Sequence, residues 1–198
     1  TKRKISYDNK QVYVDGKSTN STEARNKILS DRNSSYSAIQ SEKIMAMTRD
    51  ELREYMNDKT VVYIYHDVID NAGEHEFGVF EACEKAISEL VDLVKKLYNT
   101  LQISNYIITS DHGFIYRNKK IDASSKYLSF ASLGLDDYSQ RYAVIDDLTE
   151  LSDSNHFKME YLGGCNSNVY VPYSYDLYRK AGGGIQYIHG GASLQELM

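Results

Sequence analysis

Apolar residues recur every three or four positions in the middle of the chain, which predicts a long amphipathic helix that ends near Asn99. The recurring positions are Phe77, Phe80, Ile87, Leu90, Val91, Val94 and Leu97. A β-branched and aromatic run at 60–65 precedes this helix and an apolar run at 105–109 follows it, and both runs are typical of strands. Strand, helix and strand in this order predict a βαβ unit with parallel strands and a right-handed crossover.

Shorter elements are predicted on both sides of this unit. Upstream, the pattern favours a strand at 11–14 that Asp15-Gly16 ends, a helix over 21–29, and a helix over 49–57 that opens with the capping box Thr48-Arg49-Asp50-Glu51. Downstream, short strands are expected at 142–145, 157–162, 168–171 and 185–188. Ser193 and Glu196 repeat the capping-box spacing near the last residues. The alternation of strands and helices indicates an α/β fold.

The composition narrows the class of protein. With 198 residues, 41% of them apolar, the chain is long enough to bury one sizeable core. The net charge of −5 argues against a surface that coats nucleic acid, although a local groove stays open. The basic residues Lys2, Arg3, Lys4 and Lys10 predict a flexible arm over residues 1–10, ahead of a domain over 11–198.

Cysteine usage and hydropathy bear on the compartment. There are two cysteines, Cys83 and Cys165, and no CxxC pair, which favours a reducing cytoplasmic setting. No apolar run approaches the roughly 20 residues that span a bilayer, so we expect no membrane segment.

Three predicted strand ends carry side chains that suit a metal ion. They are the loop over 66–75, the triplet Asp111-His112-Gly113 and the triplet His189-Gly190-Gly191. In open α/β sheets, ligands bind in the crevice outside the carboxyl ends of the strands, so these loops are expected to converge. The candidate ligands are Asp70, Glu74 or His75, Asp111, His112 and His189. Carboxylates mixed with imidazoles suit zinc, manganese or iron better than calcium.

Each residue also has a simpler interpretation. A single histidine after a strand is usually a hydrogen-bonded loop residue, and Asp70 could form a turn or cap a helix. His66 and Asp67 could orient the metal ligands instead of binding the ion. No G-x-S-x-G elbow and no P-loop lysine motif accompanies these loops, so the sequence shows no nucleophile beside them.

Three stretches of the chain resemble the PglZ family of the alkaline-phosphatase-like superfamily, which belongs to bacterial BREX phage-defence systems. These stretches are Tyr65-His66-Asp67-Val68-Ile69-Asp70, Thr109-Ser110-Asp111-His112-Gly113-Phe114 and His189-Gly190-Gly191-Ala192-Ser193-Leu194-Gln195-Glu196. The Thr-Ser-Asp-His-Gly motif is common across the superfamily, whereas the other two point to PglZ itself. The resemblance extends from about Val12 to the end of the chain.

The resemblance implies a three-layer αβα sandwich with a mainly parallel sheet, and a site with two divalent metals, zinc or manganese, and a Ser or Thr nucleophile. One metal would take Asp70, Glu74 and His189. Glu74 departs from the usual histidine, and His75 could replace it. The other metal would take Asp111 and His112 together with the nucleophile and an early Asp.

The resemblance also implies which part of the domain is present. The nucleophile and its Asp should precede the βαβ unit, but Asp15-Gly16-Lys17-Ser18-Thr19 reads more readily as a turn. The chain is therefore similar to the C-terminal part of a PglZ domain. We expect a fragment of a metal-dependent phosphatase or phosphodiesterase that is inactive alone, with other BREX proteins as partners and nucleic acid as a candidate. The alternative is a non-catalytic interaction module of a BREX complex.

Overall fold

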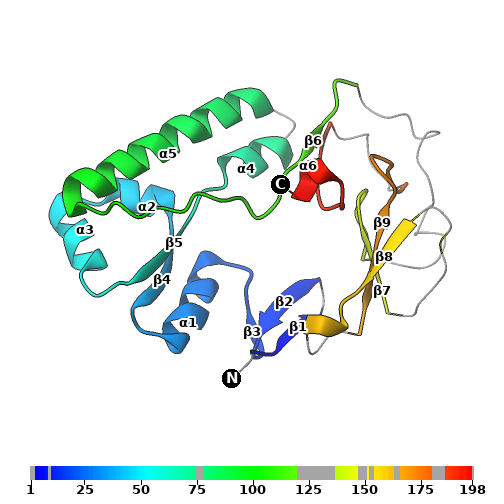
Figure 1. Cartoon of the computed structure of the whole chain (residues 1–198), viewed down its shortest axis with the longest axis horizontal. Helices are drawn as coiled ribbons and strands as arrows, with labels where there is room; N and C mark the ends of the chain where they lie inside the picture. Colours follow the sequence, from blue (N-terminus) through cyan, green and yellow to red (C-terminus); the bar gives the residue numbers. More distant parts are fainter. Residues whose placement is uncertain are drawn as a thin grey trace. The chain divides into compact units, whose positions relative to one another are not determined.

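The computed structural model describes residues 3–8, 10–74, 78–119, 137–146, 151, 154–162, 166–179 and 186–197. The chain divides into two compact units, residues 1–108 and 109–198 (Figure 1). Each unit has its own secondary structure and its own buried cluster, so each is described by itself.

The N-terminal unit contains most of the helices. Its strands are β1 (Ile5–Asp8), β2 (Gln11–Val14), β3 (Lys17–Ser18), β4 (Tyr36–Gln40) and β5 (Val61–Tyr65). Its helices are α1 (Thr22–Arg32), α2 (Ser41–Ala46), α3 (Arg49–Met56), α4 (Val68–Glu74) and α5 (Val79–Leu101). The structure confirms the predicted strand over 11–14, the strand before α4, and the helices that correspond to α1, α3 and α5.

A parallel pair of strands forms the centre of this unit. β4 and β5 pair in register from Tyr36 opposite Val61 to Gln40 opposite Tyr65. Helix α1 packs against β4, and the side-chain oxygen of Asn26 accepts a hydrogen bond of 2.8 Å from the backbone N–H of Ala38. The Asn26 side chain therefore accepts the hydrogen bond that a neighbouring strand would otherwise accept, so this backbone amide of β4 is not left unpaired.

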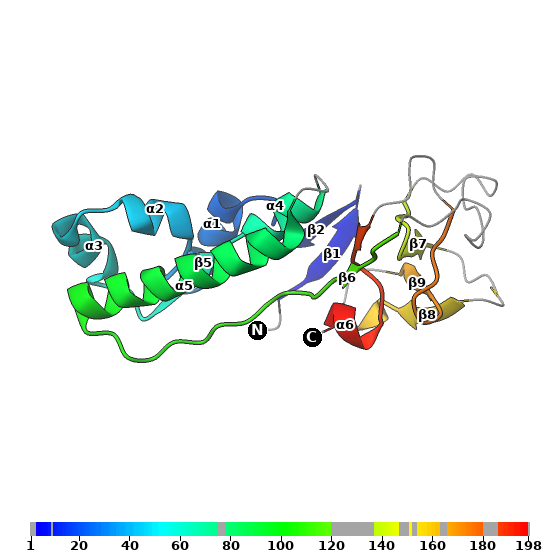
Figure 2. The ribbon, with the colours of Figure 1, turned by 90° about the horizontal axis from the view of Figure 1, so that it is seen from above.

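The buried cluster of the N-terminal unit joins this sheet to three helices. Its fully or nearly buried members are Ile39, Ile44, Leu52, Leu93 and Leu97. They come from β4, α2, α3 and α5, and Val62 and Ile64 of β5 pack against them. Figure 2 shows α5 as one long helix, and its apolar periodicity is what supplies the last two members of the cluster.

Polar caps set the limits of the helices, as the sequence predicts. The Thr48 hydroxyl accepts a hydrogen bond from the Glu51 N–H, and the Glu51 carboxylate accepts one of 2.8 Å from the Thr48 N–H, so the capping box at the start of α3 is confirmed. At the start of α1, the Ser21 hydroxyl accepts from the Ala24 N–H at 3.1 Å.

The first strands form an antiparallel sheet in the order β1-β2-β3. Asp15 and Gly16, with φ of 50° and 76°, make a two-residue turn between β2 and β3, which confirms that this stretch is a turn. Residues 5–8 of the predicted flexible arm form β1 instead. Ile5 lies opposite Val14, and pairing with β2 satisfies backbone groups that a free arm would leave to water.

The predicted strand over 105–109 is wrong. The structure assigns no strand there, and Ile107 and Ile108 are 93% and 67% exposed. Tyr106 packs against the cluster of the N-terminal unit, but its two following apolar neighbours find no buried surface. The βαβ unit expected around α5 is therefore incomplete, and the parallel pair that the structure shows is β4 and β5.

The C-terminal unit consists mainly of short antiparallel strands. They are β6 (Ile115–Tyr116), β7 (Ala143–Ile145), β8 (Ser154–Lys158), β9 (Asn168–Pro172) and β10 (Tyr187–Ile188), followed by helix α6 (Leu194–Leu197). The sheets are β7-β9-β8 and β10-β6. The prediction at 157–162 was misplaced, because β8 starts at Ser154 and a short 3₁₀ helix covers Glu160–Leu162.

The buried cluster of the C-terminal unit contains Ala143, Ile145, Tyr170 and Tyr178. The Tyr178 hydroxyl hydrogen-bonds the Ser154 hydroxyl at 2.7 Å, which satisfies a polar group that is otherwise sealed from water. Burial raises the pKa of Tyr178 to about 12, so this hydroxyl stays protonated at neutral pH.

The two units together have an α/β composition, with one two-stranded parallel sheet among antiparallel ones. The three-layer sandwich with a mainly parallel sheet is not seen among the described residues. Within that same part of the chain, no helix combines the length and the apolar character needed to cross a membrane.

Leu52 provides a test of the N-terminal cluster. It is 0% exposed, so Leu52→Ala should lower the free energy of unfolding by about 2–5 kcal/mol through lost burial and a residual cavity. Urea unfolding followed by circular dichroism measures this change. Glu54→Ala on the same helix is the control, since Glu54 is exposed and its truncation should shift the value by less than about 0.5 kcal/mol.

Candidate metal centre

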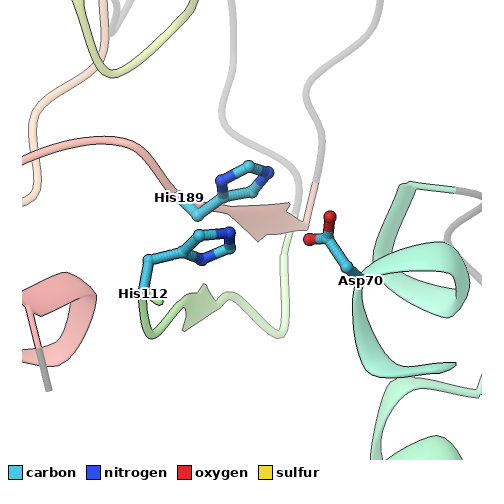
Figure 3. A group of neighbouring side chains, drawn as sticks. All are labelled: Asp70, His112 and His189. Carbon is cyan, nitrogen blue, oxygen red and sulfur yellow. The ribbon is translucent and has the colours of Figure 1, made fainter. Parts of the chain in front are cut away.

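Two histidines of the C-terminal unit lie against each other. His189 directly follows β10 and His112 precedes β6, and these two strands pair with Ile188 opposite Ile115. The antiparallel pairing brings both histidines to the same end of the two-stranded sheet. Their rings stack with centroids 4.5 Å apart and planes 6° apart (Figure 3).

The hydrogen bonding of His112 selects one ring nitrogen for a ligand. Its Nδ1 lies 3.0 Å from the carbonyl oxygen of Gly113, which can only accept. In a neutral ring, a proton on Nδ1 leaves Nε2 with a free lone pair, and this is the form that binds metal ions. One ligand nitrogen of His112 lies within 4.8 Å of one of His189. The two ligand nitrogens thus lie close enough to serve one ion or two neighbouring ions.

Local hydrogen bonds shape the turn that carries His112. The Asp111 carboxylate accepts a hydrogen bond of 3.1 Å from the His112 N–H, and the Ser110 hydroxyl donates to the His112 carbonyl. Asp111 is exposed, whereas His112 and His189 are half-buried. The Ser110 hydroxyl therefore closes the turn, as expected for a structural residue at this position.

A buried ion pair lies behind the two histidine loops. Arg141 and Glu196 have side chains that are 1% and 0% exposed, and they form a bidentate pair with Nε–Oε1 of 2.8 Å and Nη2–Oε2 of 2.6 Å. Arg141 also donates to the carbonyl oxygens of Ser174 and Asp176. Its donors are thus shared between Glu196 and the loop that follows β9, as a buried guanidinium requires.

Glu196 connects both histidine loops. Its carboxylate accepts hydrogen bonds from the Gly191 N–H at 2.9 Å and from the Ser193 hydroxyl at 2.6 Å, both in the loop after His189. Its own backbone carbonyl accepts a hydrogen bond of 2.9 Å from the Gly113 N–H, next to His112. One residue of α6 therefore fixes the backbone beside each of the two histidines.

Gly191 is required by the closeness of this ion pair. A Cβ at Gly191 would lie 2.5 Å from Nη2 of Arg141 and 2.6 Å from Oε2 of Glu196. Real side chains do not tolerate such distances, so any larger residue would push the loop away from the pair. The glycine in the His-Gly-Gly stretch thus has a packing reason.

The pKa of Glu196 reflects two opposed effects. Burial alone would raise it, but the hydrogen bonds from Arg141 and Ser193 and the charge of Arg141 outweigh burial. The pKa therefore lies below the ordinary value of 4.5, and the carboxylate is charged at neutral pH.

The remaining candidate ligands belong to the N-terminal unit. Asp70 projects from helix α4 (Figure 3), and its side chain is half-buried. Glu74 ends the same helix, one turn after Asp70, and His75 lies outside the described residues. Asp67 is exposed, and its carbonyl accepts from the Asn71 N–H at 3.0 Å.

His66 has a defined partner in the same unit. Its Nε2 lies 2.8 Å from the Glu89 carboxylate on α5, and the His66 side chain is 12% exposed. This hydrogen bond is the main reason that the pKa of Glu89 lies below its ordinary value. His66 therefore connects the end of β5 to the long helix.

Comparison with known proteins bears directly on these loops. The whole chain, residues 1–198, matches the family described as the BREX system PglZ alkaline phosphatase-like domain. The chain belongs to this family. All three stretches that resemble PglZ lie within the matched residues, including the two histidine loops.

Two curated PglZ relatives match nearly the whole chain. It is 37% identical over 196 residues to the alkaline phosphatase-like protein PglZ of Bacillus cereus (strain H3081.97), covering 96% of this chain and 23% of that protein. It is 30% identical over 205 residues to the alkaline phosphatase-like protein BrxZ of Escherichia coli O9:H4 (strain HS), covering 94% and 22%. The chain thus spans less than a quarter of the length of these relatives. No solved structure matches it.

Sequence reasoning singled out both histidines of the stacked pair but missed the ion pair behind them. In the sequence, Glu196 stands out only through its spacing from Ser193, and Arg141 has no distinguishing pattern. The sequence does indicate a role for Glu196, because a glutamate at capping-box spacing is expected to hydrogen-bond the loop that precedes it, and this loop carries a candidate ligand. Nothing near Arg141 in the sequence reveals a partner 55 residues away.

Acid should weaken the C-terminal unit through Glu196. Because its pKa is lowered in the folded state, its contribution to stability is present above pH 4.5 and is lost as the pH falls through the folded-state pKa. Glu196→Gln should therefore lower the free energy of unfolding at pH 7 by about 3–5 kcal/mol, since it leaves Arg141 buried without a counter-charge. It should also reduce the loss below pH 4.5.

Thermal unfolding of both forms between pH 3 and pH 7 measures this effect. Glu160→Gln, at an exposed position in the same unit, is the control and should leave the profile unchanged. Equal pH profiles for the wild-type protein and Glu196→Gln would refute the assigned role of the ion pair.

Proposed function

We propose that this chain supplies metal-binding loops to a phosphoric ester hydrolase of the PglZ family. The observation that carries the proposal is the stacked pair of His112 and His189, with Nδ1 of His112 on the Gly113 carbonyl. Membership of an alkaline phosphatase-like family supports it, because divalent metals are the usual cofactors of that superfamily.

In this proposal the ligands divide between two divalent ions, zinc or manganese. Asp70, His189 and either Glu74 or His75 hold one ion, and Asp111 and His112 hold part of the shell of the other. Carboxylate oxygens with imidazole nitrogens are a donor set that both metals accept. When bound, such ions lower the pKa of an attacking oxygen and neutralise charge on phosphate.

The chain's other residues position these ligands. The Gly113 carbonyl holds His112 in the tautomer that presents Nε2, as outer partners of metal-bound histidines do. Arg141 and Glu196 hold the backbone of both loops in place before an ion binds, so metal binding does not have to order the two imidazoles. His66, held by Glu89, and Asp67 are candidates for a similar role beside Asp70.

The nucleophile is expected elsewhere in the full-length protein. Ser110 is engaged in its own turn, and Ser18 and Thr19 follow a tight turn between two strands. The isolated chain is therefore proposed to be inactive. Phosphate monoesters and nucleic-acid diesters are both candidate substrates of the complete enzyme, with other BREX proteins as its partners in the cytoplasm.

A second candidate function is a non-catalytic interaction module of a BREX assembly. Under that alternative the histidine loops have only a structural role, which is to pack around the buried ion pair of Glu196 and Arg141. Metal content separates the two functions, because a structural loop has no need for an ion.

The ligand proposal predicts specific losses of metal. After loading with zinc and desalting, the chain should retain the ion, and His112→Ala or His189→Ala should each weaken binding by roughly 10- to 100-fold. Isothermal titration and elemental analysis of the desalted protein measure this. His156→Ala is the matched control, since His156 lies on an exposed strand of the same unit and should bind zinc like the wild type.

Two outcomes would count against the metal centre. One is a chain that retains no zinc or manganese while Asp111→Ala leaves both its stability and its spectra unchanged. The other is equal loss of zinc in the His156→Ala control, which would indicate binding at the surface.

The activity proposal has its own test. The 198-residue chain should hydrolyse neither p-nitrophenyl phosphate nor bis-p-nitrophenyl phosphate above background, whereas the full-length protein should hydrolyse at least one with added zinc or manganese. Asp111→Ala in the full-length protein should reduce turnover by 100-fold or more, because one ligand of the metal beside the nucleophile is lost. Robust turnover by the chain alone that Asp111→Ala abolishes would show that the nucleophile lies within it.

A further inference from the structure

Helix α5 has an apolar stripe on its exposed side. Phe80, Ile87, Val91 and Tyr98 are 60%, 64%, 46% and 51% exposed. They recur at intervals of seven, four and seven residues, so they project from one side of the helix. The buried side, with Ala86, Leu93 and Leu97, faces the cluster of the N-terminal unit instead.

This stripe is larger than a surface helix needs. It extends over about 27 Å of helix and consists of two aromatic and two β-branched side chains. Single exposed apolar residues are ordinary, but a row of them along one side of a helix is typical of a helix–helix interface.

The row is symmetric about its own centre. Phe80 and Tyr98 lie nine residues to either side of Glu89, and Ile87 and Val91 lie two residues to either side. When two copies of α5 pack antiparallel, Phe80 faces Tyr98 of the second copy and Ile87 faces its Val91. A two-fold axis then pairs the same patch with itself, which is the usual geometry of a homodimer.

We propose that α5 is the dimerisation helix of this protein and that the stripe packs antiparallel on the stripe of a second copy. The charges beside the stripe support this direction. Glu84 and Lys95 flank the apolar residues, and antiparallel packing brings Glu84 beside Lys95 of the second copy, twice in each dimer. Parallel packing would not bring Glu84 to Lys95 of the second copy, because the two positions lie about 16 Å apart along the helix.

The other charged groups on α5 leave this pairing intact. The Lys95 ammonium lies 3.3 Å from the carboxylate of Asp92 on the same helix, and both side chains are more than half exposed. Such a pair within one helix is weak and leaves the ammonium free to make a second contact. Glu89 is the midpoint of the row in sequence, but its carboxylate contacts His66 and Lys85 on another side of the helix. No like charges therefore meet at the two-fold axis.

Sedimentation equilibrium of the full-length protein tests the proposal. The wild-type protein should dimerise with rising concentration. Glu84→Lys and Lys95→Glu should each weaken the dimer roughly tenfold, because each change creates two like-charge contacts. The double variant Glu84→Lys/Lys95→Glu should restore dimerisation, since the charges are then exchanged across the axis. Glu54→Lys on α3 carries the same charge change at an exposed position and should have no effect.

Ile87→Glu separates the dimer from other occupants of the stripe. It should abolish dimerisation and leave the thermal unfolding temperature of the protein at high dilution unchanged. A protein that is monomeric at all concentrations overturns the proposal. A double charge variant that stays as weak as the single ones also overturns it. Loss of folding stability in dilute Ile87→Glu shows that another part of the same polypeptide covers the stripe, and this too overturns it.

Discussion

The C-terminal unit depends on one fully buried ion pair, Arg141 with Glu196. The described strands there are short and helix α6 is a single turn, so the loops need another constraint on their backbone. The ion pair provides it, because both oxygens of the Glu196 carboxylate bond Arg141 and the loop after His189, and the backbone carbonyl of Glu196 bonds the loop of His112. This polar centre thus holds the backbone beside each of the stacked histidines.

The N-terminal unit is organised by an apolar cluster. Its cluster joins one parallel strand pair to three helices through apolar side chains, with polar caps deciding where the helices start. The charged contacts there, such as His66 with Glu89, lie at the margin of the cluster. The proposed ligands thus rest on two kinds of support: Asp70 lies on helix α4, which packs against α5, and His112 and His189 lie on loops held by hydrogen bonds to Glu196.

Local patterns predicted local structure well. The periodicity of α5 and the Thr48–Glu51 capping box are set by contacts within a few residues, so the sequence shows both partners. The strand over 105–109 failed because a strand requires a neighbour, and nothing in an apolar run says whether one is present. Arg141 was missed for the same reason, since its partner lies far along the chain. The family motifs located His112 and His189, but not what holds them.

The fit of Gly191 against Arg141 and Glu196 has a consequence for how such proteins can diverge. A change at any one of the three positions leaves either a buried charge without its counterpart or a collision with the loop. Intermediates that carry only one of the changes would be unstable, so drift at this triad requires concerted replacement. We therefore expect strong epistasis between the glutamate that ends the His-Gly-Gly-Ala-Ser-Leu-Gln-Glu stretch and this distant arginine.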